Sequence, residues 1–222
     1  MLKKLKCGEL AFVLGTVLSA LGIALQTKAD IGISMVAAPA YILSLKIPVL
    51  SFGISECLVQ CGLFILCCFI TKKFAWRILW SFLVAIPYAG VLDCMMNIVS
   101  NIQLVSFVDR LFLFLIGTAV LAAGIAFYFR TNLPAQIYEM FVKVLSEYKN
   151  WNINKVKIIY DWISCIIAIL MSLLFFKALR GIGFGTIICA LLNGPLIALC
   201  GKFLDKHMDF SPLIKDCKIK NH

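Results

Sequence analysis

The chain contains a succession of apolar runs, several of them 18 or more residues long. A helix of about 20 apolar residues crosses the hydrocarbon core of a bilayer, which is about 30 Å thick. Within lipid the backbone polar groups must bond to one another, so runs of this kind form helices that cross the membrane. A composition of 62% apolar and 14% charged residues agrees with this class. We therefore expect an all-α integral membrane protein with a single membrane domain over 1–222.

We predict six transmembrane helices, over residues 8–27, 50–70, 76–99, 110–129, 156–176 and 183–201. Two further segments, 32–45 and 134–148, are too short or too charged to cross. Each is expected to form a re-entrant or interfacial helix. Asp30 would cap the first short helix and Asn132 the second, since Asx side chains accept from the free N–H groups of a first turn. Residues 204–222 form a basic tail.

The distribution of positive charge predicts the orientation. With six spans and the N-terminus inside, sixteen of the 21 Lys and Arg residues face the cytoplasm and five face outside. If both short segments also crossed, the ratio would be fourteen to seven. The positive-inside rule therefore favours a multi-pass protein with both termini cytoplasmic. The net charge of +10 lies in short clusters between apolar runs, so we expect the lipid bilayer as partner and no nucleic acid.

A motif occurs twice, 102 positions apart. Each copy has two glycines seven positions apart, then a basic residue, then Asp or Asn; the copies are Gly15, Gly22, Lys28, Asp30 and Gly117, Gly124, Arg130, Asn132. Three spans per half is an odd number, so the halves would face opposite ways as a 3+3 inverted repeat over 8–99 and 107–203. Small residues allow helices to approach closely in lipid. The predicted helix-packing residues are Gly15, Gly22, Gly117, Gly124, Gly185 and Gly194.

Two stretches carry a family resemblance. They are Ala20-Leu21-Gly22-Ile23-Ala24 through Lys28-Ala29-Asp30-Ile31-Gly32, and Gly181-Ile182-Gly183-Phe184-Gly185-Thr186 with Gly194-Pro195. Together they resemble the first and last helices of the YczE/YyaS/YitT-type bacterial membrane proteins. The usual Gly-x-Gly-Thr is interrupted here by an extra Phe-Gly. The resemblance implies a bacterial inner-membrane protein and carries over no activity.

Ionisable residues inside a span usually face a cavity or a bundle interior. Glu56 shares a helix face with Gln60, and Asp93 shares one with Asn97. In the six-span topology both acids lie in the outer third of the membrane, near Asp30. They would either form a polar outer vestibule that holds a proton or cation, or only lock helices together.

Asp161 is the third acid inside a predicted span, and it lies in the inner third of the membrane near Arg130 and Asn132, Lys155 and Lys157. It would form a structural ion pair with a basic neighbour or act as a gate. The second short helix would also leave room for an anion, because neutral Asn132 stands at its start beside Arg130.

Asn193 and Tyr88 lie mid-span, near the bilayer centre where transporters built from repeats bind substrate. They would either contribute to such a site or serve helix packing alone. We therefore predict a secondary transporter of a small solute, with its site between the first, third, fourth and sixth spans. Two alternatives stay open: an accessory membrane protein that scaffolds a partner, and the substrate-capturing subunit of a vitamin importer. A homodimer stays open too.

Motifs for catalysis and for metal binding are missing. The chain has no His-Glu-x-x-His, no Gly-x-Ser-x-Gly and no phosphate loop. It has no Cys-x-x-Cys, and its two histidines, His207 and His222, lie in the predicted tail. We expect no enzyme activity, no metal site and no cofactor.

Overall fold

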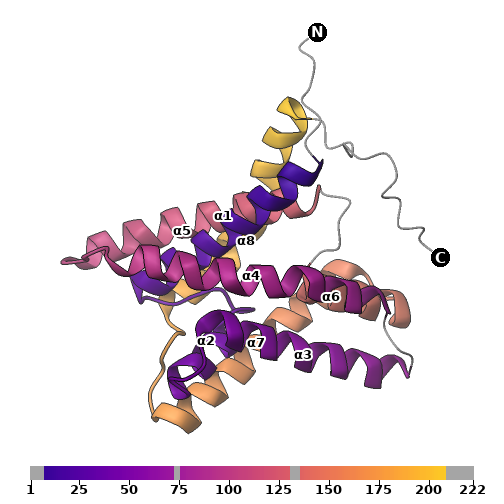
Figure 1. The fold of residues 1–222 in the computed structure, drawn as a ribbon, viewed down its shortest axis with the longest axis horizontal. Helices are drawn as coiled ribbons and strands as arrows, with labels where there is room; N and C mark the ends of the chain where they lie inside the picture. The colour runs from indigo at the N-terminus through magenta and orange to yellow at the C-terminus, as the bar shows by residue number, and fades with distance from the viewer. Residues whose placement is uncertain (1–7, 73–75, 131–135, 209–222) are drawn as a thin grey trace.

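The computed structural model describes residues 8–72, 76–130 and 136–208, which form eight α-helices and no strand (Figure 1). Asn132 and most of the predicted tail lie outside the described residues. The helices are α1 (Gly8–Ala29), α2 (Ala38–Lys46), α3 (Phe52–Thr71), α4 (Trp76–Ser100), α5 (Phe107–Tyr128), α6 (Ile137–Lys149), α7 (Ile153–Phe176) and α8 (Phe184–His207).

Five of these helices are long and apolar enough to cross a membrane, namely α1, α3, α5, α7 and α8. Helix α4 has 25 residues, of which Val84–Ser100 counts as a shorter apolar segment. Helices α2 and α6 have only 9 and 13 residues. The predicted class, a multi-pass helical membrane protein, is confirmed, and the two short helices occur where the apolar pattern shortens.

Helix α2 begins later than predicted, and Asp30 does not cap it. The N-cap position is Ala37, and Pro39 occupies the first turn, where its missing N–H is tolerated. Asp30 instead lies in the turn that ends α1, with a left-handed φ of 54°, and its exposed carboxylate is 3.5 Å from Arg110. The predicted cap was wrong because residues 32–34 are irregular and 35–37 form a turn, so the helix begins only at Ala38.

Helix α6 also begins later than predicted, with Gln136 and not Asn132 at its N-cap position. Its apolar face does not lie on lipid. Ile137 and Phe141 are buried against α3, α4 and α7, in a cluster that includes Tyr160. The far end of α6 is exposed, so this helix runs from the protein interior to the surface.

The helices form two groups (Figure 1). Helices α1, α5 and α8 pack together in one group, and α3, α6 and α7 with α2 form the other. Helix α4 connects them, because it packs on α1 and also on α3 and α6.

The closest helix pair is α1 with α5, and four of the predicted glycines lie at their crossing. A methyl group on Gly22 would lie 2.5 Å from the backbone nitrogen of Leu121. A Cβ on Gly15 would lie 3.1 Å from the Gly124 carbonyl oxygen, and one on Gly117 would lie 3.0 Å from the Gly22 carbonyl oxygen. Only glycine permits this approach of two backbones.

The other two predicted packing glycines differ from each other. A Cβ on Gly185 would lie 2.8 Å from the Ile31 carbonyl oxygen, so α8 begins tightly against the loop after α1. A Cβ on Gly194 would meet nothing within 4 Å, which corrects the packing role predicted for it. Helix α8 also continues to His207, past the predicted end of the repeat.

Candidate functional site

A cavity of about 450 Å³ lies between the two helix groups. It is lined by every helix except α2, and by residues 34–37 just before α2. Pockets for small organic ligands have volumes of about 300–1,000 Å³, so the cavity is of ligand size. We expected a site between α1, α4, α5 and α8; helices α3, α6 and α7 also contribute to its wall.

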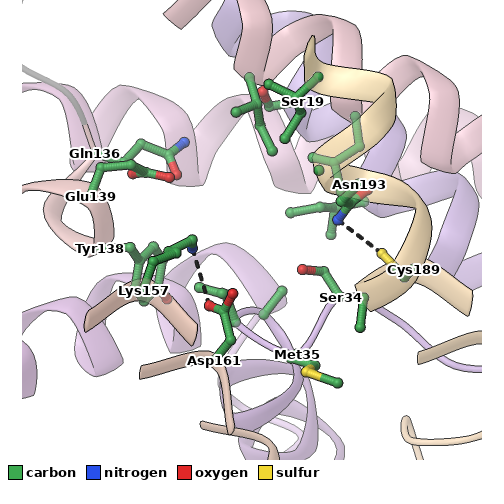
Figure 2. A pocket seen from close by; sticks show the side chains of 18 of the residues that line it. Ser19, Ser34, Met35, Gln136, Tyr138, Glu139, Lys157, Asp161, Cys189 and Asn193 are labelled. Atoms are coloured by element: carbon green, nitrogen blue, oxygen red, sulfur yellow. Dashed lines mark hydrogen bonds and ion pairs between the residues drawn. The ribbon is translucent and has the colours of Figure 1, made fainter. Parts of the chain in front are cut away.

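Four of the predicted candidate residues line this cavity. They are Glu56 from α3, Tyr88 from α4, Asp161 from α7 and Asn193 from α8. Figure 2 shows Asn193 and Asp161 on different sides of the same space. Two helices from each half of the chain, α3 and α4 with α7 and α8, therefore bring these four polar residues to one cavity.

Glu56 is the most deeply buried acid among these residues, with 2% of its surface exposed. Ser51 caps α3, and its hydroxyl accepts from the Ile54 backbone N–H at 3.1 Å. Helix α3 therefore begins directly after Ser51, and Glu56, in its second turn, faces the cavity. The Tyr138 hydroxyl lies beside the Glu56 carboxyl. Oε2 of Glu56 has no hydrogen-bond partner among the described residues.

Glu139 also lines the cavity, and we did not predict this (Figure 2). Glu139, Lys143 and Glu147 follow one another at four-residue spacing, a pattern typical of a solvated helix face. Lys143 and Glu147 are exposed, but the first turn of α6, which carries Glu139, is not. Burial raises the pKa of Glu139, and the nearby Lys157 ammonium opposes that rise. The repeat offered a signal, because Glu139 stands 102 positions after Ala37, which lines the same cavity.

Asp161 pairs with Lys157, one of the partners considered for it. Lys157 Nζ lies 3.1 Å from Asp161 Oδ1, one helical turn apart on α7 (Figure 2). Arg130, another candidate partner, is engaged elsewhere: its Nη2 donates to Asp205 Oδ2 at 2.6 Å, joining the C-terminal ends of α5 and α8. Lys155, also considered, is exposed on α7.

Asp93 does not face the cavity. Its Oδ1 accepts from the Gly53 backbone N–H at 2.8 Å, and its Oδ2 accepts from the Ser51 hydroxyl at 2.6 Å. The carboxylate therefore satisfies free donors at the start of α3 and ties α4 to that helix. Asp93 therefore has the second of the two roles considered for it, which is to lock helices together.

The predicted outer vestibule does not form. Glu56 faces the cavity, Asp93 is used at the start of α3, and Asp30 is exposed beside Arg110. Gln60 is fully buried and does not line the cavity, and Asn97 is exposed.

A buried hydrogen-bond network that we did not predict supports the cavity wall. Gln26 is fully buried; its Nε2 donates to Thr118 Oγ1 at 3.1 Å, and its Oε1 accepts from the Ser34 backbone N–H at 3.1 Å. The Tyr128 hydroxyl donates to Thr16 Oγ1 at 2.8 Å. Ser34 and Tyr128 both line the cavity, so the α1–α5 pair holds two parts of its wall in place.

The fold and the cavity define a multi-pass helical membrane protein with a ligand-sized space between two helix groups, mostly apolar and with a few polar groups in its wall. The chain belongs to the family of unknown function DUF6198, whose model matches residues 7–202. No curated protein matches it. No solved structure matches it either. The resemblance to the YczE/YyaS/YitT-type proteins stays a prediction.

Proposed function

We propose that this protein is a secondary transporter of a small solute in the bacterial cell membrane, not an enzyme. In this proposal α4 also crosses the membrane, which makes six spans. The halves form a 3+3 inverted repeat, both termini are cytoplasmic, and the cavity is the solute site. The observation that carries the proposal is that residues related by the repeat meet on this cavity.

Contacts between α1 and α5 support the repeat, because they occur in exchanged pairs. Gln26 bonds to Thr118, and Tyr128 bonds to Thr16. Tyr128 stands 102 positions after Gln26, and Thr118 stands 102 positions after Thr16. The Gly15–Gly124 and Gly117–Gly22 contacts exchange in the same way. A two-fold axis between the halves would produce such pairs.

The cavity residues follow the same relation. Glu56 and Asp161 stand 105 positions apart, and so do Tyr88 and Asn193, the extra three residues being a loop insertion. All four line the cavity. In transporters built from inverted repeats the solute site lies at the interface of the repeats, near the bilayer midplane.

The two halves differ in one respect that supports alternating access. Helix α3 packs on α4, but the equivalent helices α7 and α8 do not pack on each other within the described residues. Both α7 and α8 line the cavity. In an inverted repeat the second conformation exchanges the roles of the halves, so α7 would close on α8 while α3 parts from α4.

Flux in proteoliposomes tests this function. The purified chain would be reconstituted, and uptake of amines, amino acids, sugars, carboxylates and protons followed against empty vesicles. We expect saturable flux of at least one solute class, lost in Glu56→Gln and Asp161→Asn and retained in Glu147→Gln, an exposed acid on α6.

Absence of flux for every class would contradict the transporter. Tight binding of one ligand without flux would then favour the capturing subunit of an importer. Co-purification of one stoichiometric partner, lost on deletion of 203–222, would favour the scaffold.

A further inference from the structure

The charged side chains that face the cavity do not balance. Three acids line the cavity, Glu56, Glu139 and Asp161, and the one lysine or arginine among the described lining residues is Lys157. Its ammonium lies 3.1 Å from Asp161 and also acts on the nearby Glu139, so one ammonium faces three carboxyl groups. The ionised cavity is therefore negative.

The polar atoms without partners here are mainly acceptors. Oε2 of Glu56, Oε2 of Glu139 and Oδ1 of Asn193 are buried and have no hydrogen-bond partner among the described residues. The hydroxyls of Ser19 and Tyr138, which can also donate, are without a partner there too. Ionised carboxylates and amide oxygens only accept hydrogen bonds. A buried charge without a partner is strongly unfavourable. A ligand that supplies positive charge would offset that cost.

The rest of the wall is mainly apolar and aromatic, with the polar side chains of Ser19, Ser34 and Gln136 among it. Tyr88, Tyr128, Phe129, Tyr138 and Trp162 line the cavity. Ring faces attract organic cations, and this attraction grows when water is excluded. A bare metal ion would leave most of the 450 Å³ unfilled and would meet apolar carbon over much of the wall.

The helix N-termini at the cavity do not offer a site for an anion. At the start of α2 the backbone N–H groups of Ala37 and Ala38 both donate to the Ser34 carbonyl oxygen, at 3.1 and 3.0 Å, and Pro39 has no N–H. At the start of α6 the acidic Glu139 occupies the first turn. Both positive helix ends are therefore already compensated.

We propose that the cavity binds a hydrophobic organic cation, an amine or quaternary onium compound, with its charge at Glu56 and Glu139 and its apolar part against the aromatic rings. This inference rests on the proposed function, because it takes the cavity as the solute site.

Two probes of the same shape and opposite charge test it. Tetraphenylphosphonium and tetraphenylborate would be titrated into the purified full chain in neutral micelles by calorimetry, with empty micelles as the partition blank. We expect one saturable phosphonium site per chain and only partitioning for the borate. The double variant Glu56→Gln/Glu139→Gln should weaken phosphonium binding by about tenfold or more, because both charges are removed.

Glu147→Gln is the matched control, an acid-to-amide change on the exposed part of α6, and should leave the affinity unchanged. Lys157→Gln should tighten binding, because it releases the carboxylate of Asp161. Saturable borate binding, or an unchanged phosphonium affinity in the double variant, would overturn the inference. If size-exclusion chromatography shows that the double variant is unfolded, unchanged or weaker binding in Lys157→Gln overturns it instead.

The two proposals fail separately. Saturable phosphonium binding without flux of any solute class would leave the cation site standing and remove the transporter. Flux of a neutral or anionic solute by a chain that does not bind phosphonium would support the transporter and overturn the cation site.

Discussion

Glu56 and Asp93 have the same chemistry and opposite surroundings. Both are acids inside apolar runs, which makes each a functional candidate by sequence. Asp93 bonds to two donors at the start of α3, whereas Oε2 of Glu56 lies beside a cavity without a hydrogen-bond partner among the described residues. The difference lies in the neighbours, because a carboxylate stabilises structure wherever donors converge on it.

Asp93→Ala should therefore lower stability and leave the cavity intact. It removes two hydrogen bonds to a carboxylate, and we expect a loss of about 2–4 kcal/mol in the free energy of unfolding. Chemical denaturation in mixed micelles measures this. Asp93→Asn should lose less, since its amide oxygen still accepts from Gly53, and Asn97→Ala on the same helix should be near neutral. A stable Asp93→Ala chain would show that Asp93 has another role.

At the scale of elements, the pair α1–α5 organises the molecule. Its glycines bring two backbones together, and its threonines accept hydrogen bonds across the crossing. In lipid, burial of apolar surface gives little drive for helix association, so close packing and buried hydrogen bonds must supply it. The network at Gln26 and Tyr128 lies on this pair and reaches the cavity.

Gly22→Ala should destabilise the chain by roughly 1–3 kcal/mol, a typical cost of overpacking. The added methyl group would lie 2.7 Å from Cα of Leu121, where backbone must move. Gly62→Ala is the matched control, because a Cβ at that position in α3 meets nothing within 4 Å. Thermal unfolding in detergent compares the two. Equal midpoints would mean that α1 and α5 are not closely packed.

At the scale of the whole molecule, the proposed orientation in the membrane follows from six spans and the distribution of positive charge. The loop between α4 and α5 should face outside, and the loop between α6 and α7 should face the cytoplasm. Val105 is 93% exposed in the first loop, and Trp151 is 54% exposed in the second.

A membrane-impermeant maleimide checks this orientation. Val105→Cys should be labelled in intact cells, and Trp151→Cys only after permeabilisation, with the unmodified chain reporting the background from its own cysteines. Labelling of both sites in intact cells, or the reverse order, would contradict an inward-facing pair of termini.

The sequence by itself determined the class of the protein, the approximate places of its helices and the acids inside its apolar runs, Glu56, Asp93 and Asp161. Apolar length decides which segments can cross lipid, and small residues at regular spacing indicate a packed face, because both depend on local geometry. The exchanged α1–α5 contacts lie on the motif that the sequence repeats at 102 positions.

Only the tertiary structure decided which polar groups face the cavity. Glu139 reads as a surface charge by its spacing, yet the first turn of α6 enters the protein, and Arg130 finds Asp205 rather than Asp161. The starts of α2 and α6 also differ from the Asx caps expected for them. The sequence of a helix sets which of its residues share a face. The rotation and depth at which the helix packs depend on all of its neighbours at once. The packing therefore decides whether a carboxylate lies beside hydrogen-bond donors, beside a cation or beside a cavity.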